Sequence, residues 1–379
     1  LALLVSAVCV GGTLFGAHYV EGEVFETHYE AMVKDREYAR SLAGRVVNAD
    51  LIMETAQAYA HVPTQGIYYD TEEYQTFARP YDAIYSLTRT VYNTESRRFN
   101  MEDYQKLTKE QAEQFYSLRH DRQVKLVEAT HMSAKAQEKV LALDQQIQTP
   151  WIFSYTGGYT RFFVIINTIG IIAAFVMAVC IAPLFSGEYV SGTDQLLLAS
   201  KYGKNKLIYA KLFTGFSFGA ITSLVFTLLA YTLSLLLLGS DGANAPLQLY
   251  FTMSPYPLTM GETAAILGVC TFFACLMTTS ITMLLSAIMK SPYYVIILIS
   301  LLLVLPLFYS MSQTNLLLYN LYNLLPANMM TLSNVLGGIQ YELEGLIIKP
   351  YVFMPLFSGA MCLLLTPLTY RSFKNHQIV

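Results

Sequence analysis

LFSGEYVSGTDQLLLASKYGKNKLIYAKLF, residues 184–213, lies between two segments that are apolar enough to cross a membrane. This stretch contains Glu188, the pair Gly192 and Thr193, and four lysines. It is either an ordinary loop between two spans or a segment with a function of its own. Its side of the membrane, and then its role, follow from the rest of the chain.

The composition is that of a membrane protein. Of 379 residues, 54% are hydrophobic and only 13% are charged, and the mean hydropathy is +0.39; these values are unusual for a purely soluble protein. A helix that crosses the hydrocarbon core of ~30 Å needs about 20 mostly apolar residues. We therefore expect an all-α polytopic membrane protein with six transmembrane helices, at 1–20, 161–184, 207–238, 264–289, 293–309 and 351–370.

The first of these segments starts at Leu1 without a Met, so we expect that residues before it are missing. A cleaved secretory signal also begins with an apolar run, but it needs a basic region in front of that run. The five further spans downstream favour a first transmembrane helix.

Basic residues set the orientation, because Lys and Arg in short loops are retained on the cytoplasmic side. They gather after the second span, after the fourth span and in the tail, at Lys201, Lys204, Lys206, Lys211, Lys290, Arg371 and Lys374. The loop 239–261 has no Lys or Arg, and the loop 310–350 has only Lys349. Both termini are therefore predicted to face the cytoplasm, on the same side as the opening stretch.

This orientation divides the chain into regions. They are a first span (1–20), an extracytoplasmic helical domain (21–160), a second span (161–184), a cytoplasmic segment (185–206), spans three to six (207–370) with external loops 239–261 and 310–350, and a cytoplasmic tail (371–379). The loop 310–350 has few charges, and we expect a short re-entrant or surface helix within it.

The composition of the external domain predicts long helices. No Gly or Pro occurs between Tyr81 and Thr149, and strong helix formers dominate. Asn100 and Asp103 resemble a helix-capping pair, and Pro150 ends the run. A second helical stretch is expected to pass through Val33, and the segment 61–80 is the predicted loop between the two. The five cysteines all lie in apolar segments, so no disulfide holds this domain together.

An aromatic group in this domain has two readings. Its members are Tyr68, Tyr69, Tyr74, Phe77, Tyr81 and Tyr85. They can fill the core of a disulfide-free bundle, which we favour, or form a surface for an amphipathic ligand. His18 and His28 lie near Glu21, Glu23 and Glu26, but their spacing matches no metal-ligand pattern, so we expect no metal site.

Several kinds of chemistry have no motif in the sequence. There is no G-x-x-x-x-G-K-[ST] loop for ATP, no H-E-x-x-H and no G-x-S-x-G. The acidic residues after Arg161 all lie at or beyond the predicted span ends, at Glu188, Asp194, Asp241, Glu262, Glu342 and Glu344. Ion and proton carriers usually keep such groups within their spans, so that class is disfavoured. The Ser and Thr residues in the spans are expected to help helices pack and bond to each other, at Thr227, Ser234, Thr271, Thr278, Thr279, Ser280 and Thr282.

The opening stretch itself predicts a short helix. Gly192 breaks the second span, Thr193 is a candidate N-cap, and Asp194 lies in the first turn, where the helix dipole favours a negative charge. Lys201 falls near the end of this helix, and Gly203 can terminate it.

The same residues resemble the membrane subunits of ATP-binding-cassette exporters of the ABC type 2 permease family. Members often show F-x-x-E, three residues, G-T, two leucines, P-x-S-R, and a Lys that opens the next span. The matching positions here are Phe185, Glu188, Gly192, Thr193, Leu196, Leu197 and Lys211. Lys204 stands in place of the Arg, and Lys201 and Gly203 replace the usual Pro and Ser.

The resemblance implies a coupling segment that docks on a separate ATPase. Glu188 would lie at the hinge, and Lys201, Lys204 and Lys206 would face the ATPase or anionic lipid headgroups; topology alone also explains these lysines. The chain would bind no cofactor itself, whereas its partner ATPase would bind ATP and Mg. Two permease subunits, identical or different, and two ATPase subunits would form the exporter, with no role for nucleic acid.

The predicted function is thus export of an amphipathic substrate, with an antimicrobial or other hydrophobic peptide as the first candidate and lipid, drug or glycan as others. A non-transporting sensor or mechanotransmitter coupled to an ATPase is the alternative. An intramembrane enzyme is the least favoured reading, because no catalytic constellation lies within the spans.

Overall fold

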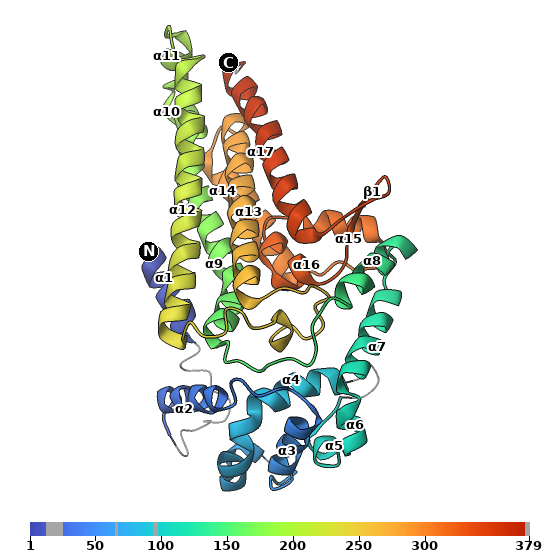
Figure 1. Ribbon diagram of the computed structural model, residues 1–379. Coiled ribbons are helices and arrows are strands. Elements are labelled where there is room, and N and C mark those ends of the chain that lie inside the picture. The colour runs from blue at the N-terminus through green and yellow to red at the C-terminus, as the bar shows by residue number, and fades with distance from the viewer. Residues whose placement is uncertain (13–25, 65–66, 94–97, 376–379) are drawn as a thin grey trace. The chain divides into compact units, whose positions relative to one another are not determined.

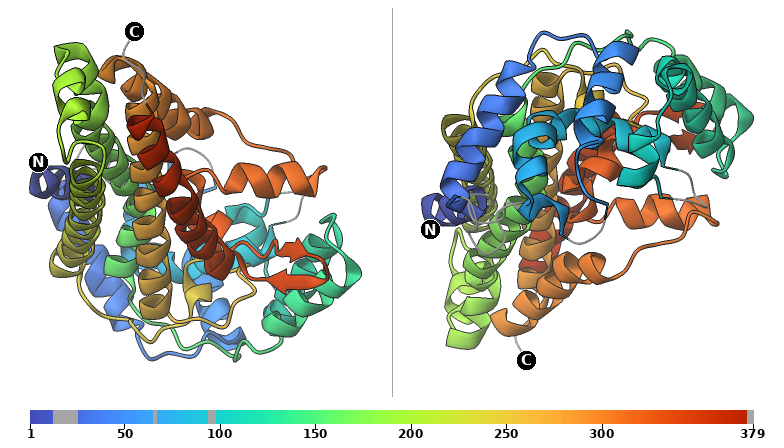
Figure 2. Two further views of the ribbon diagram at one scale, coloured as in Figure 1. Left: turned by 90° about the horizontal axis from the view of Figure 1, so that it is seen from above. Right: turned by 90° about the horizontal axis from the view of Figure 1, so that it is seen from below.

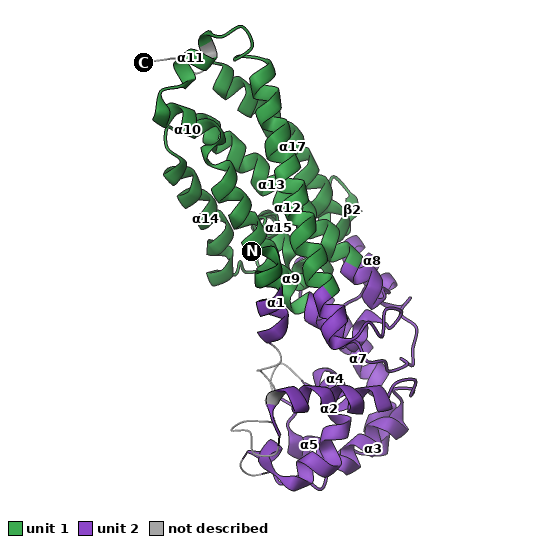
Figure 3. Cartoon of the chain, turned by 90° about the vertical axis from the view of Figure 1, so that its left-hand side faces the viewer, with its two compact units in different colours: residues 1–6, 163–232, 265–379 green, residues 7–162, 233–264 purple. Residues whose placement is uncertain are grey.

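The computed structural model describes residues 1–12, 26–64, 67–93 and 98–375, and they form a mostly helical protein (Figure 1). Contacts divide the chain into two compact units, which Figure 3 shows in separate colours. Unit 1 comprises residues 1–6, 163–232 and 265–379, and unit 2 comprises 7–162 and 233–264.

Unit 2 holds the helices of the predicted external region. They are α2 (His28–Ser41), α3 (Ala49–Tyr59), α4 (Asp82–Tyr92), α5 (Met101–Gln105), α6 (Lys109–Glu113), α7 (Phe115–Glu128) and α8 (Ala134–Asp144). The predicted loop 61–80 contains three short helical turns, at Tyr68–Asp70, Tyr74–Ala78 and Arg79–Tyr81. A further turn, Leu247–Leu249, lies in the loop 239–261.

The prediction of long helices between Tyr81 and Thr149 is wrong, because the described residues of that range form five shorter helices. Polar side chains start new helices inside it. The Asn100 and Thr108 side chains accept the backbone N–H three residues ahead in two capping boxes, and Ser133 caps α8 in the same way without a box. The predicted pairing of Asn100 with Asp103 is confirmed. The last helix ends at Asp144, before Pro150.

An aromatic core holds unit 2 together. The Tyr59 ring stacks on Tyr85 at 4.2 Å between centroids and meets Tyr104 edge-on at 5.9 Å. Tyr74 and Tyr85 are buried, and Tyr68, Tyr69 and Tyr81 pack against them. The structure therefore supports the core reading of the aromatic group, except for Phe77, which is 45% exposed.

Unit 1 consists mainly of long apolar helices. The helices of the chain that lie wholly or largely in it are α9 (Gly157–Ile181), α10 (Pro183–Ser191), α11 (Asp194–Ala199), α12 (Lys206–Leu238), α13 (Met260–Ile288), α14 (Pro292–Phe308) and α17 (Pro350–Lys374). Between α14 and α17 lie α15 (Leu316–Asn323), a turn at Asn328–Met330, α16 (Leu332–Leu336) and an antiparallel pair of strands, β1 (Tyr341–Leu343) and β2 (Leu346–Ile348). These short helices agree with the expectation of a helix within 310–350. The remaining helix, α1 (Ala2–Gly11), is shared between the units.

Among the described residues, four helices rather than six are long and apolar enough to cross a membrane. They are Gly157–Ser191, Lys206–Leu238, Met260–Ile288 and Pro350–Lys374. The predicted fifth span is the 17-residue α14. The predicted first span overlaps α1, which has 10 residues, and continues into residues outside the described part. A six-span topology stays a prediction.

Small residues let α12 and α13, which Figure 2 shows from above and from below, approach each other closely in unit 1. A Cβ added to Gly219 would lie 2.5 Å from Thr279 Oγ1, and one added to Gly215 would lie 2.4 Å from Met283 Sδ. This contact agrees with the expected packing role of small and polar residues.

The predicted hydrogen bond between helices is confirmed for Thr279, whose hydroxyl donates to Met177 Sδ of α9 at 3.8 Å, and is wrong for three other residues. The hydroxyls of Thr278, Ser280 and Thr282 donate instead to the backbone of their own helix, four residues earlier. Such bonds are available locally in any helix, so these side chains need no partner on another one.

Candidate coupling site

The backbone of the opening stretch forms two helices and a turn. The helix after Pro183 continues to Ser191, seven residues beyond the predicted end of the second span. Gly192 then ends it in the left-handed region, with φ 67°, a conformation that favours glycine. The prediction that Gly192 ends the helix of the second span is confirmed.

The following helix, α11, is shorter than predicted. It ends at Ala199, where Ser200 donates its hydroxyl to the Leu197 carbonyl oxygen at 2.7 Å, so Lys201 and Gly203 lie outside it. Thr193 precedes the helix, but its side chain makes no capping bond. Its hydroxyl instead lies 2.8 Å from the hydroxyl of Ser191.

Two charged residues of the predicted motif meet in the structure. The Lys211 ammonium of α12 donates to Glu188 Oε1 of α10 and to the Leu184 carbonyl oxygen. Both side chains are mostly buried, with 12% of Lys211 and 18% of Glu188 exposed. The second carboxylate oxygen of Glu188 is buried without a hydrogen bond to any described residue. The pair ties α10 to α12 across 23 residues of sequence.

Aromatic rings surround this ion pair. The Lys211 nitrogen lies 5.1 Å from the centre of the Phe185 ring and 5.5 Å from that of Phe373, near the end of α17. The Phe185 and Phe373 centroids are 4.9 Å apart, and Tyr189 stacks on Phe373 at 5.8 Å. A cation against two ring faces is favourable, more so where water is excluded. We call Phe185, Glu188, Lys211 and Phe373 the α10–α12–α17 clamp.

Where α9 ends and α10 begins, a hydroxyl group from another helix forms hydrogen bonds with the backbone. Pro183 has no N–H and interrupts the ladder of helix hydrogen bonds. Ser286 of α13 lies there, buried. Its Oγ accepts the N–H groups of Phe185 at 3.0 Å and Ser186 at 3.1 Å, and donates to the Ala182 carbonyl oxygen at 2.6 Å. Tyr189 adds a bond to the Ala287 carbonyl oxygen at 2.8 Å. The start of α10 is therefore anchored to the end of α13.

The other predicted lysines lie apart from the clamp. Lys201, Lys204 and Lys206 are exposed. The ammonium groups of Lys201 and Lys206 lie 5.4 and 4.7 Å from the centre of the Tyr202 ring. The structure thus brings together Phe185, Glu188 and Lys211, and leaves the three lysines as a basic surface.

Sequence reasoning missed Ser286, Tyr189 and Phe373 as parts of this site. Ser286 is one of many hydroxyl residues in α13, and Phe373 lies in a stretch that was read as a tail. Neither has a local signal, because their positions beside residue 185 depend on how the helices pack.

Unit 2 contains buried charges of its own. The fully buried Arg79 side chain pairs with Glu26 and with Asp35, the latter at 2.8 Å from its Nε. Arg119 of α7 pairs with Asp144 at 2.6 Å and donates to the carbonyl oxygens of Thr252 and Ser254, both at 3.1 Å. These hydrogen bonds connect the loop after α12 to α7 within unit 2.

One carboxyl group in unit 2 has a perturbed pKa. Burial raises the pKa of Asp82 above its ordinary value, although hydrogen bonds from the Tyr59 and Tyr74 hydroxyls, at 3.0 and 3.4 Å, act against that rise. In the described part of the chain, no three His, Cys, Asp or Glu residues are placed to hold a metal ion. His18, Glu21 and Glu23 lie outside that part.

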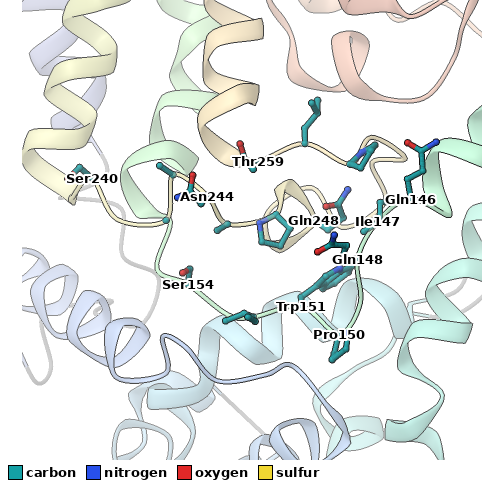
Figure 4. Close-up of a pocket in the computed structure, with 17 residues that line it drawn as sticks. Gln146, Ile147, Gln148, Pro150, Trp151, Ser154, Ser240, Asn244, Gln248 and Thr259 are labelled. Atoms are coloured by element: carbon teal, nitrogen blue, oxygen red, sulfur yellow. The ribbon is translucent and has the colours of Figure 1, made fainter.

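A cavity of about 800 Å³ lies in unit 2 (Figure 4). Its walls come from residues 146–154 and from the loop after α12, with Gln146, Gln148, Asn244 and Thr259 among the polar side chains. Two lining residues carry buried polar atoms without a hydrogen-bond partner among the described residues, namely Trp151 Nε1 and Gln248 Oε1. The cavity has the size of a small-molecule site.

Comparison with known proteins identifies the family. Residues 38–367 match the family model described as ABC-2 family transporter protein. No curated protein and no solved structure matches the chain. Since the family match covers most of the chain, including the whole of 184–213, the protein belongs to the ABC-2 transporter family and is a membrane-embedded permease of that type.

Proposed function

We propose that this permease is the transmembrane subunit of an ATP-driven exporter in a bacterial cytoplasmic membrane, and that residues 185–211 couple it to a separate ATPase. The observation that carries the proposal is the α10–α12–α17 clamp. It joins three helices through a nearly buried ion pair directly beside an exposed basic segment. A rigid joint next to an exposed segment is what a contact with a motor protein needs.

The mechanism follows from these contacts. ATP and Mg would bind to the partner, and closure of two ATPase subunits would press on α11 and on the surface of Lys201, Lys204 and Lys206. The clamp would pass this movement to α12 and α17. The Pro183 interruption lets α10 tilt against α9, and α10 also contacts α14. Tilting of the second and fifth spans would then open an outward path between two permease subunits.

The proposed cargo is amphipathic, with a hydrophobic or antimicrobial peptide as the first candidate and lipid, drug or glycan as others. The hydroxyl side chains inside the long helices mostly bond to their own backbone, which leaves apolar surface. Such surface suits an amphipathic molecule better than an ion, which needs polar groups to replace its water.

The first experiment tests the partner. The chain is co-expressed with the ATPase encoded beside it, and vanadate-sensitive ATP hydrolysis is measured after purification through the permease. We expect the ATPase to co-purify and to hydrolyse ATP. A well-folded permease to which no such ATPase binds would contradict the proposal.

The second experiment tests the clamp with Glu188→Gln, Lys211→Met and the double variant. Each single change leaves one charge unpaired, which costs about 3–5 kcal/mol for a fully buried pair and less here. The double variant removes both charges and regains stability. We expect the double variant to assemble with the ATPase but to lose coupled transport by at least about tenfold, or 1.4 kcal/mol. If transport returned with stability, the pair would have only a structural role.

A sensor or mechanotransmitter is the second candidate, and the unit 2 cavity favours it. A ligand that bound there would change ATPase activity without being moved. Inverted vesicles distinguish the two functions, because an exporter accumulates its cargo in them and a sensor does not.

A further inference from the structure

A second cavity, of about 660 Å³, lies in unit 1 between the start of α12 and the end of α17. In Figure 1 these two helix ends are the upper ends of α12 and α17. The cavity is lined by Tyr209, Leu212, Phe213 and Phe216 from α12, and by Thr366, Pro367, Tyr370, Arg371, Lys374 and Asn375 from α17 and its cap. We call it the α12–α17 groove.

Contacts between the two helices hold the groove open at its charged end. The rings of Tyr209 and Tyr370 lie 5.1 Å apart. The Tyr370 hydroxyl donates to the carbonyl oxygen of Lys204 at 3.2 Å and lies 3.4 Å from Asn205 Oδ1. The turn before α12 is thereby fixed to α17, so the groove exists before any ligand arrives.

The charge of the groove has one sign. Arg371 and Lys374 are exposed, and no acidic residue lines the groove. Neither residue forms an ion pair with any residue between 26 and 375 that the structure describes. The Lys374 ammonium lies 5.6 Å from the centre of the Tyr370 ring. Two positive charges therefore stand at the mouth without a counter-charge among the described residues.

Polarity falls along both walls in the same direction. On α17 the lining passes inward from Lys374 and Arg371 to Thr366. On α12 it passes from Tyr209 to Phe216, which is about 10 Å along a helix at 1.5 Å per residue. Phe213, between them, is 75% exposed. The groove thus has a cationic end, a tyrosine level and an apolar end, which is the order of a lipid from headgroup to acyl chain.

We propose that the α12–α17 groove binds a phospholipid with an anionic headgroup, whose phosphate lies between Arg371 and Lys374 and whose acyl chain follows Phe213 and Phe216. Free phosphate would use only the cationic end. A zwitterionic lipid would gain less from the two cations, since basic pockets between membrane helices favour anionic headgroups. The bound lipid also bridges α12 and α17, the helices that supply Lys211 and Phe373 to the clamp.

The test measures lipid binding by the purified full chain, and it needs no ATPase. Phosphatidylglycerol, phosphatidylcholine and inorganic phosphate are each added in detergent, and retained lipid and Tm are recorded by native mass spectrometry and thermal unfolding. We expect phosphatidylglycerol to be retained and to raise Tm, and phosphate alone to do neither. Arg371→Gln with Lys374→Gln should weaken retention roughly 30-fold, at about fivefold per charge.

Lys290→Gln is the matched control, because Lys290 is an exposed basic residue that does not line the groove. It should bind phosphatidylglycerol as the wild type does. If the double variant folded poorly, each single variant should still weaken retention, and Phe216→Ser should weaken it through the apolar end.

Three results would overturn the proposal. They are equal retention of the two phospholipids, unchanged retention by the Arg371 and Lys374 variants, and full competition by inorganic phosphate, which would make the groove an anion site. A second copy of the chain as occupant would appear as a dimer that the double variant abolishes and that phosphatidylglycerol does not affect. Since binding alone is measured, the result is independent of whether the chain is an exporter.

Discussion

Asp82 connects the stability of unit 2 to pH. Its carboxyl group accepts the Tyr59 hydroxyl at 3.0 Å within the aromatic core, and burial raises its pKa above the ordinary value. A carboxyl whose pKa is higher in the folded than in the unfolded state binds its proton more tightly when folded. Its contribution to stability is therefore complete below the unfolded value near pH 3.9 and is lost as pH rises through the folded value.

Asp82→Asn should remove that dependence. The amide keeps an oxygen that accepts from Tyr59 and carries no charge at any pH. Between pH 4 and 7 we expect Tm of the variant to rise relative to the wild type as pH increases, and a gain of 1 kcal/mol corresponds to about 4–8 °C in a small domain. The single tryptophan, Trp151, lies in the same core, so its fluorescence in the full-length protein reports this unfolding. A difference between variant and wild type that stays constant across this range would contradict the prediction.

At the candidate site, the sequence motif predicts which residues of 184–213 belong to the site, but it does not predict the contacts that they make. The spacing of Phe185, Glu188 and Lys211 was visible along the chain, and all three meet in the clamp. Ser286 and Phe373 complete the site from helices about 100 and 190 residues after Phe185. No local pattern marks them, because side chains this distant are brought together only by the packing of whole helices.

At the scale of the element, the junction of α9 and α10 depends on one hydroxyl. Ser286→Ala would leave the N–H groups of Phe185 and Ser186 buried without a partner, at about 1–3 kcal/mol for each unsatisfied group. We expect this variant to lose roughly 2 kcal/mol or more of stability and the amides of 183–191 to exchange hydrogen faster, measured by mass spectrometry on the full chain.

Ser280→Ala is the control for that variant. Ser280 is also buried in α13, but its hydroxyl donates to the Leu276 carbonyl oxygen of its own helix. Without the hydroxyl, this carbonyl oxygen still accepts its backbone N–H within the helix. Loss of the Ser280 hydroxyl should leave the rate of amide hydrogen exchange in residues 183–191 unchanged. If the two variants behaved alike, the anchoring role of Ser286 would be wrong.

The helices of the two units were predictable to different degrees. In unit 1 the length of the apolar runs predicted four long helices whose ends lie within seven residues of the observed ends, because a membrane span needs a minimum length. In unit 2 composition favoured helix throughout 82–149, and capping side chains such as Asn100 and Ser133 divided it. Helix propensity is a property of a whole window of residues, whereas a capping side chain starts a helix at a single residue. The sequence therefore predicted helical structure in this range correctly but missed the ends of the individual helices.

For the whole molecule, the contacts of unit 2 bear on topology. The loop after α12 belongs to the same compact unit as residues 26–162, and Arg40 pairs with its Asp241 at 2.5 Å. Two long helical segments, Gly157–Ser191 and Lys206–Leu238, separate these parts of the chain. Two crossings return the chain to the side on which it started, so this contact agrees with the charge pattern, which predicts that both segments span.

Whether the loop 310–350 lies outside depends on whether α14 crosses the membrane. Its 17 residues extend about 26 Å at 1.5 Å each, less than the ~30 Å core. A helix this short can still cross if the bilayer thins or flanking residues reach the interface. The tyrosines at its two ends, Tyr293 in the first turn and Tyr309 just after the helix, are exposed and suit such an interface.

Single cysteines at Ser117, Ser200, Thr314 and Asn375 test this in a background without the five native cysteines. All four positions are exposed. We expect a membrane-impermeant maleimide to label positions 117 and 314 in intact cells, and positions 200 and 375 only after permeabilisation. Three crossings, α12, α13 and α14, separate position 200 from position 314, so they lie on opposite sides only if α14 spans. Labelling of position 314 solely after permeabilisation would show that α14 does not cross and would remove the fifth span from the coupling mechanism.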